Sequence, residues 1–194
     1  MSPSPDPMRL PPLVSADWLA ANRAAVAVAD ARWYLDGRPA LAEYEKGHID
    51  GAVFVDMDTD LSDHSLPATM GRHPLPSPAA FAAAMSRLGI GDNTPVVAYD
   101  DSGGVTAGRL VVMLRSLGHS AALLDGGVAA WSGALVQGAP VARPSARFTE
   151  RPWPADRFAS LEEVGAIAAR ADTRTVLLDA RAGDRYREIG RAHV

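Results

Sequence analysis

The segment Pro95-Val-Val-Ala-Tyr-Asp-Asp-Ser-Gly-Gly-Val-Thr-Ala107 decides the fold class of this chain. Its first five residues, through Tyr99, form an apolar run of the kind that a strand buried on both faces requires. A glycine-containing turn follows, and residues 107–117 then have the pattern of an apolar helix that Gly118 ends. The order of strand, tight turn and helix predicts one unit of a parallel α/β sheet.

The same alternation extends on both sides of this segment. Short apolar runs end at turn residues, and helical stretches with capping residues or terminal glycines lie between them. The predicted strands are residues 26–30, 52–55, 95–99 and 121–124, and the predicted helices are residues 16–22, 40–47, 79–88 and 107–117, with another beginning at 128. Strands that alternate with helices predict a parallel sheet that helices cover on both faces.

The composition is that of a globular protein, and it argues against several functional classes. The chain has 194 residues, of which 47% are hydrophobic and 22% charged, and its formal net charge is -4. A mildly acidic chain without a basic block is a poor partner for nucleic acid. No apolar run reaches the roughly 18 residues that would span a bilayer, and the first residues do not resemble a secretory signal. We therefore expect a cytoplasmic protein that binds neither nucleic acid nor membrane.

The chain contains no cysteine. This absence excludes disulfides, thiolate metal ligands and a cysteine nucleophile within these 194 residues. The acidic residues Asp58 and Asp60 lack the glycine and the later glutamate of a calcium loop. The histidines also lack metal-ligand spacing: His48, His64, His73 and His119. No metal site is predicted, and without a glycine-rich nucleotide motif no cofactor is expected either.

The pattern of helix and strand restarts near the carboxyl terminus. Residues 139–157 contain several prolines and arginines without periodicity, and we interpret them as a linker. After this stretch, Ser160 begins a capped helix, and Leu178-Asp-Ala-Arg181 repeats Ala29-Asp-Ala-Arg32. The repeat predicts that a second copy of the domain begins here, with a strand at residues 175–179. The alternative is that Asp-Ala-Arg recurs by chance.

We therefore divide the chain into four parts. Residues 13–138 form a complete domain, residues 139–157 the linker, and residues 158–187 the start of a second, truncated domain. Residues 188–194, Glu-Ile-Gly-Arg-Ala-His-Val, match what a common sequencing adapter encodes, and we interpret them as an artefactual tail. The alternative is a genuine carboxyl-terminal tail.

Several motifs stand in an order that points to one family. They are Tyr44-Glu-Lys-Gly-His-Ile-Asp-Gly-Ala52, His73-Pro-Leu-Pro-Ser-Pro78, Gly89-Ile-Gly-Asp-Asn-Thr-Pro-Val-Val-Ala-Tyr-Asp100 and Leu123-Leu-Asp-Gly-Gly-Val-Ala-Ala-Trp131. Over about residues 13–187 the chain resembles the tandem-domain rhodanese family, the thiosulfate and 3-mercaptopyruvate sulfurtransferases. One departure is Asp50, where the family usually has proline. The resemblance implies a rhodanese-like α/β fold, a parallel sheet flanked by helices on both faces.

The resemblance also implies a reaction. In the family, a cysteine thiolate takes the outer sulfur of thiosulfate or 3-mercaptopyruvate as a persulfide, and a thiol or cyanide acceptor removes it. In tandem members the second domain carries this cysteine, usually in a Cys-x-x-Gly-Val-Thr-Ala loop. Here the first domain has Asp101-Ser-Gly-Gly-Val-Thr-Ala107, which puts Asp101 in the cysteine position. A carboxylate cannot form a persulfide, so no catalytic residue is expected in this chain.

Three residues match positions on the family's substrate side. Arg185 corresponds to an arginine that binds the donor anion, and its guanidinium can offer two parallel hydrogen bonds. Asp58 and His73 correspond to residues that line the interdomain site of mercaptopyruvate sulfurtransferases. The alternatives are a solvated arginine, a loop-capping aspartate and a turn histidine. His48 belongs to a signature that inactive domains share, and we expect it to be structural.

Two functional hypotheses follow. The chain is either the amino-terminal part of a tandem sulfurtransferase, inactive by itself, or a stand-alone rhodanese module without catalysis that has a binding or regulatory role. The first hypothesis leaves thiosulfate and 3-mercaptopyruvate open as donors, and a thiol and cyanide as acceptors. Neither hypothesis fixes the oligomeric state.

Overall fold

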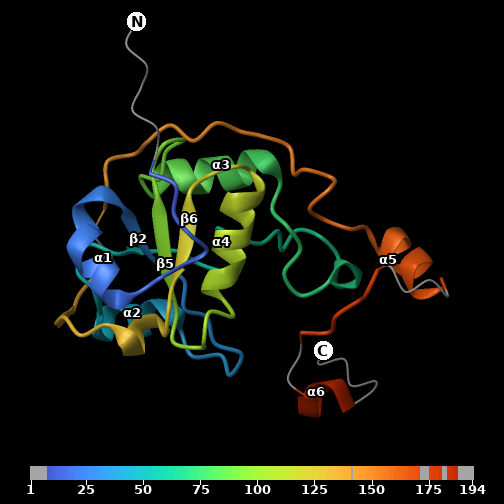
Figure 1. Ribbon diagram of the computed structural model, residues 1–194, viewed down its shortest axis with the longest axis horizontal. Helices are drawn as coiled ribbons and strands as arrows, with labels where there is room; N and C mark the ends of the chain where they lie inside the picture. Colours follow the sequence, from blue (N-terminus) through green and yellow to red (C-terminus); the bar gives the residue numbers. More distant parts are fainter. Residues whose placement is uncertain (1–7, 141, 171–174, 181–182, 188–194) are drawn as a thin grey trace, which may run out of the picture. The chain divides into compact units, whose positions relative to one another are not determined.

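A computed structural model describes residues 8–140, 142–170, 175–180 and 183–187, with only the backbone of residues 68, 184 and 185 (Figure 1). Its centre is a five-stranded parallel sheet in the order β1-β6-β5-β2-β4. These strands are β1 (Leu13–Val14), β2 (Ala27–Asp30), β4 (Val53–Phe54), β5 (Val96–Tyr99) and β6 (Ala121–Leu124). The predicted parallel α/β sheet is confirmed.

Helices cover both faces of this sheet (Figure 1). They are α1 (Ala16–Asn22), α2 (Ala40–Lys46), α3 (Pro78–Arg87) and α4 (Ala107–Ser116), and they lie within two residues of the predicted ranges. Alternate residues of a strand face opposite sides. Accordingly, Ala98 packs in one core cluster with α3 and α4, and its neighbour Val97 packs in the other with α1 and α2.

Short elements complete the first part of the chain. They are the 3-10 helices η1 (Arg23–Ala25), η2 (Ala68–Met70) and η3 (Gly127–Ala130) and an antiparallel pair of strands, β3 (His48–Ile49) and β7 (Leu135–Val136). The helix expected from residue 128 is thus a single 3-10 turn. Strand β1 was not predicted, because a strand of 2 residues is too short to show periodicity.

The segment expected to be a linker packs against the first domain as far as Trp153. The chain divides into two compact units between Trp153 and Pro154. Phe148 is buried and meets Phe81 edge-on, at 5.7 Å between ring centroids. A Cβ atom on Gly89 would lie 2.6 Å from Cβ of Arg143, so this close approach requires glycine. The packing of this segment extends the first unit beyond residue 138.

The second unit contains the predicted helix but lacks the predicted strand. Helix α5 (Leu161–Ala168) begins with a capping box between Ser160 and Glu163, and α6 (Gly183–Arg187) follows later. Residues 175–180 form no strand, and the side chains of Val176 and Leu178 are 70% and 88% exposed. The strand prediction is wrong for this chain. A strand is stable only when it pairs, and no described residue of this unit pairs with this segment.

Acid is expected to destabilise the first unit through His119. This ring is 8% exposed and stacks on Phe148 at 4.3 Å between centroids. Its Nδ1 lies 3.1 Å from the carbonyl of Asp92, while its Nε2 has no partner among the described residues. Burial lowers the pKa of His119 below its ordinary value of 6.5, because a charged ring would lose its water.

The sign of the effect follows from proton linkage. The unfolded chain binds a proton at His119 more readily than the folded chain does, so this contribution to stability is complete above about pH 6.5 and is lost as the pH falls. We expect the variant His119→Asn to lose less unfolding free energy than the wild type between about pH 7.5 and about pH 5.5. Urea denaturation of the wild type and of His119→Asn at the two pH values measures how much unfolding free energy each protein loses. Equal losses in the two proteins would rule out His119 as the group responsible.

Candidate functional site

Three positions that the sequence analysis discusses, Asp58, His73 and Asp101, lie in the loops that follow β4 and β5 at the carboxyl edge of the sheet, next to the loop that follows β2. Ligand sites in parallel α/β sheets gather at this edge. After β2, two neighbouring aromatic residues reach into the other two loops. The indole Nε1 of Trp33 donates to Oδ2 of Asp58 at 3.4 Å, and the hydroxyl of Tyr34 donates to Oδ2 of Asp101 at 2.6 Å. The two aspartates therefore belong to one connected set of loops.

The loop after β5 wraps around the carboxylate of Asp100, which is fully buried. Five hydrogen bonds reach this group from Ser102 N (3.0 Å), Gly104 N (2.8 Å), Thr106 N (2.9 Å), Thr106 Oγ1 (3.0 Å) and Ala107 N (2.9 Å). Burial alone would raise the pKa of Asp100, but the backbone donors outweigh it and hold the pKa below its usual value. Four backbone amides of this loop thus donate to a protein carboxylate.

Asp101, which stands in the family's cysteine position, is exposed at the start of this loop. Its carboxylate accepts a hydrogen bond from the Tyr34 hydroxyl. Burial of Tyr34 and the nearby Asp101 carboxylate raise the pKa of the tyrosine, so its hydroxyl keeps the proton that it donates. Asp101 thus presents a carboxylate at the position where sulfur transfer in the family requires a cysteine thiolate.

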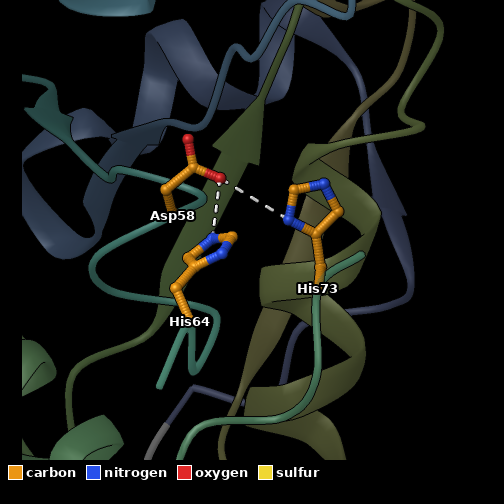
Figure 2. A group of neighbouring side chains, drawn as sticks. All are labelled: Asp58, His64 and His73. Atoms are coloured by element: carbon orange, nitrogen blue, oxygen red, sulfur yellow. Dashed lines mark hydrogen bonds and ion pairs between the residues drawn. The ribbon is translucent and has the colours of Figure 1, made fainter. Parts of the chain in front are cut away.

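A second group lies in the long loop between β4 and α3, where Asp58, His64 and His73 converge (Figure 2). Oδ1 of Asp58 lies 3.1 Å from Nε2 of His64 and 3.5 Å from Nδ1 of His73. The rings of the two histidines meet edge-on at 5.9 Å between centroids. Spacing along the sequence did not predict this cluster, because the loop folds back on itself to form it.

Helix α4 holds this loop in place through Arg109. The guanidinium donates to the carbonyl oxygens of Leu61 at 2.8 Å, His73 at 2.8 Å and Pro74 at 3.2 Å. At the start of the loop, the Asp56 carboxylate accepts the backbone N–H of Asp58 at 2.8 Å. Arg109 therefore ties the His73 end of the cluster to helix α4, and Asp56 orders the Asp58 end within the loop itself.

The environment of His73 favours its neutral form. Partial burial lowers the pKa of His73, and the charge of Asp58 offsets this only in part. Edge-on contact with the Trp33 ring, at 4.9 Å between centroids, fixes one side of the imidazole. An uncharged, oriented imidazole can accept a proton or bind a metal ion.

The residues that the sequence analysis singled out lie in different parts of the structure. Asp58 and His73 lie together, whereas Arg185 is in α6 and its side chain is outside the described residues. His48 is buried, stacks on Tyr44 at 3.7 Å between centroids and places Nδ1 2.9 Å from the Tyr44 carbonyl, which is a structural role. Sequence reasoning did not assign roles to Trp33, His64 and Arg109, whose parts in this site depend on tertiary contacts.

The sequence pattern of the rhodanese-like domain family matches residues 15–134, which is most of the first unit. The chain belongs to the rhodanese-like domain family. The fold agrees with this assignment. The crystal structure of SseA from Escherichia coli, reported as a 3-mercaptopyruvate sulfotransferase of rhodanese fold, superposes with a TM-score of 0.80 at 32% identity. That match covers 91% of this chain and 68% of SseA.

Curated relatives of this rhodanese-like chain are sulfurtransferases. It is 45% identical over 130 residues to human 3-mercaptopyruvate sulfurtransferase, and this match covers 61% of this chain and 42% of the human protein. It is 43% identical over 125 residues to thiosulfate/3-mercaptopyruvate sulfurtransferase 2 of Arabidopsis thaliana, and this match covers 62% of this chain and 35% of the plant protein. The matched region thus spans less than half of either relative.

Within the described part of the chain, no helix has the length and apolar character that crossing a membrane requires.

Proposed function

We propose that this rhodanese-like unit is the non-catalytic part of a sulfurtransferase that uses thiosulfate or 3-mercaptopyruvate as donor. The observation that carries the proposal is the loop after β5, where Asp101 stands in the position of the sulfur-accepting cysteine and Asp100 accepts four of the loop's backbone N–H groups. Because the chain contains no cysteine, the thiolate that accepts sulfur has to come from sequence outside these 194 residues.

In this proposal the unit contributes groups that position the donor. Asp58 Oδ1 faces Nδ1 of His73 at 3.5 Å and can orient the imidazole. An anionic donor beside His73 would favour the protonated ring over the neutral form that burial favours, and the second N–H of that ring can then donate to the anion. Arg185, in the second unit, is the other residue for which we propose a contact with a donor anion, through its guanidinium. The cysteine thiolate attacks the outer sulfur of the donor and becomes a persulfide, while sulfite leaves from thiosulfate or the enolate of pyruvate leaves from 3-mercaptopyruvate. A thiol or cyanide then attacks the outer sulfur of the persulfide, takes it and releases the cysteine thiolate.

The test begins with the gene. The source DNA is read beyond the codon for Arg187, and the longer protein that it encodes is purified beside the 194-residue chain. Each is incubated with thiosulfate or 3-mercaptopyruvate and then with cyanide, and thiocyanate is measured. We expect turnover by the longer protein and none by this chain. A stop codon directly after Val194, or turnover by the 194-residue chain, would overturn the proposal.

A binding or regulatory module without catalysis is the second candidate, favoured by the same occupied loop. A stop codon after Val194 would support it. Limited proteolysis then gives an independent check, because an authentic carboxyl-terminal segment of a stand-alone module should be protected at residues 158–187.

The residues assigned to the donor can be tested in the longer protein. We expect Asp58→Asn and His73→Gln each to lower kcat/KM for the donor by roughly tenfold to a hundredfold, the equivalent of one lost hydrogen bond to a charged group. Asp63→Asn is the matched control, since this carboxylate lies in the same loop but accepts from Ser65 N at 2.9 Å. If all three variants kept the wild-type kcat/KM, Asp58 and His73 would have no part in donor binding.

A further inference from the structure

We propose that Asp58, His64 and His73 form a binding site for a divalent transition-metal ion, of which zinc suits the ligands best (Figure 2). The proposal concerns binding by this chain and does not depend on sulfur transfer. The ligand atoms are Oδ1 of the aspartate, Nε2 of His64 and Nδ1 of His73.

The spacing of the three atoms fits a tetrahedral ion. Zinc binds nitrogen and oxygen ligands at about 2.0–2.1 Å, which places neighbouring ligand atoms of a tetrahedron about 3.4 Å apart. Asp58 Oδ1 is 3.1 Å from the His64 nitrogen and 3.5 Å from the His73 nitrogen. All three atoms lie within 4.8 Å of one another, so rotations of the side chains suffice to admit an ion.

Contacts around the cluster hold the ligands for this role. The Trp33 indole donates to Oδ2 of Asp58, which leaves Oδ1 directed at the two imidazoles. Arg109 binds the backbone carbonyl of His73, and Asp56 binds the backbone N–H of Asp58. Such outer contacts orient metal ligands and strengthen binding.

The donor set selects the class of ion. Two imidazoles and one carboxylate suit zinc, copper, nickel and cobalt, whereas magnesium and calcium require oxygen ligands. The side chains of Asp58 and His64 are 49% and 51% exposed, so an ion can enter from solvent and keep at least one position for water or an anion. The chain has no cysteine, so no thiolate competes for the ion.

The proposal is tested by titrating the chain, free of any affinity tag and treated with chelator, with zinc chloride in a calorimeter. We expect one ion per chain. We expect His64→Gln, His73→Gln and Asp58→Asn each to weaken zinc binding by about tenfold or more. Cobalt(II) provides a second readout, because its visible spectrum reports tetrahedral coordination. Magnesium chloride is expected to give no binding.

Two control variants keep the test specific. Asp63→Asn removes a carboxylate of the same loop that is bound to Ser65, and His193→Gln removes a histidine distant in sequence from the cluster. Both should bind zinc as the wild type does. Because His64 is exposed, His64→Gln should fold normally, which circular dichroism checks. Absence of stoichiometric binding, unchanged binding by His64→Gln, or loss of binding in either control would overturn the proposal.

Discussion

Replacing Asp100 with alanine is expected to lower the free energy of unfolding by about 4 kcal/mol. The fully buried carboxylate accepts four backbone N–H groups and the Thr106 hydroxyl, which together shape the loop between β5 and α4. Without this acceptor the donors lose their partner, and each donor that stays out of water costs about 1–3 kcal/mol. Urea denaturation followed by circular dichroism measures the loss.

The neighbouring residue provides the control for this prediction. Asp101 is also an aspartate of this loop, but it is exposed and accepts a hydrogen bond from the Tyr34 hydroxyl. Asp101→Ala should therefore cost only a small fraction of what Asp100→Ala costs. Similar losses in the two variants would mean that the loop does not depend on the buried carboxylate. Asp100→Asn should fall between wild type and alanine, because an amide retains one of the two acceptor oxygens.

Arg32→Ala is expected to lower the free energy of unfolding by about 3 kcal/mol. Asp30, at the end of β2, is fully buried and pairs with Arg32 Nη2 at 2.6 Å. The same Nη2 donates to the carbonyl of Gly47 at 2.9 Å. Burial alone would lower the pKa of Arg32, but the hydrogen bond and charge of Asp30 raise it above its usual value. Removing the arginine leaves a buried charge without its counterion.

The chain contains a second pair with the same spacing on its surface. Asp36 accepts both the backbone N–H of Arg38, at 3.0 Å, and its side-chain Nε, at 2.8 Å, as Asp30 does with Arg32. Both side chains of the Asp36 pair are more than half exposed. Since solvent screens exposed ion pairs, Arg38→Ala should change the denaturation midpoint little. Equal shifts for Arg32→Ala and Arg38→Ala would contradict the role of burial.

The regular part of the fold was predictable because its residues carry local signals. Apolar runs such as 96–99 and 121–124 correspond to strands, and Gly118 follows the helix expected at residues 107–117. The segment at 175–179 carries the same signal and forms no strand. An apolar run specifies a strand only where a neighbouring strand can complete its hydrogen bonds.

The candidate site was predictable only in part. Asp58 and His73 came from family resemblance, and the structure brings them together. His64 was considered in the sequence analysis and given no role, because a loop has no period that would place residues 58, 64 and 73 on one side. Arg109 was hidden for a related reason. It lies on α4, and its role comes from carbonyl groups that are more than 30 residues away in the chain.

The short strand β1 also affects how copies of this protein behave toward one another. Leu123 N donates to the Pro12 carbonyl and Asp125 N to the Val14 carbonyl, while the buried side chain of Leu10 anchors the segment. These bonds use the backbone groups along the outer edge of β6. An open sheet edge offers such groups to strands of other molecules and is a common origin of aggregation. Strand β1 becomes the new edge of the sheet, but it is only 2 residues long. Such a short edge offers a strand of a neighbouring copy few backbone groups with which to pair.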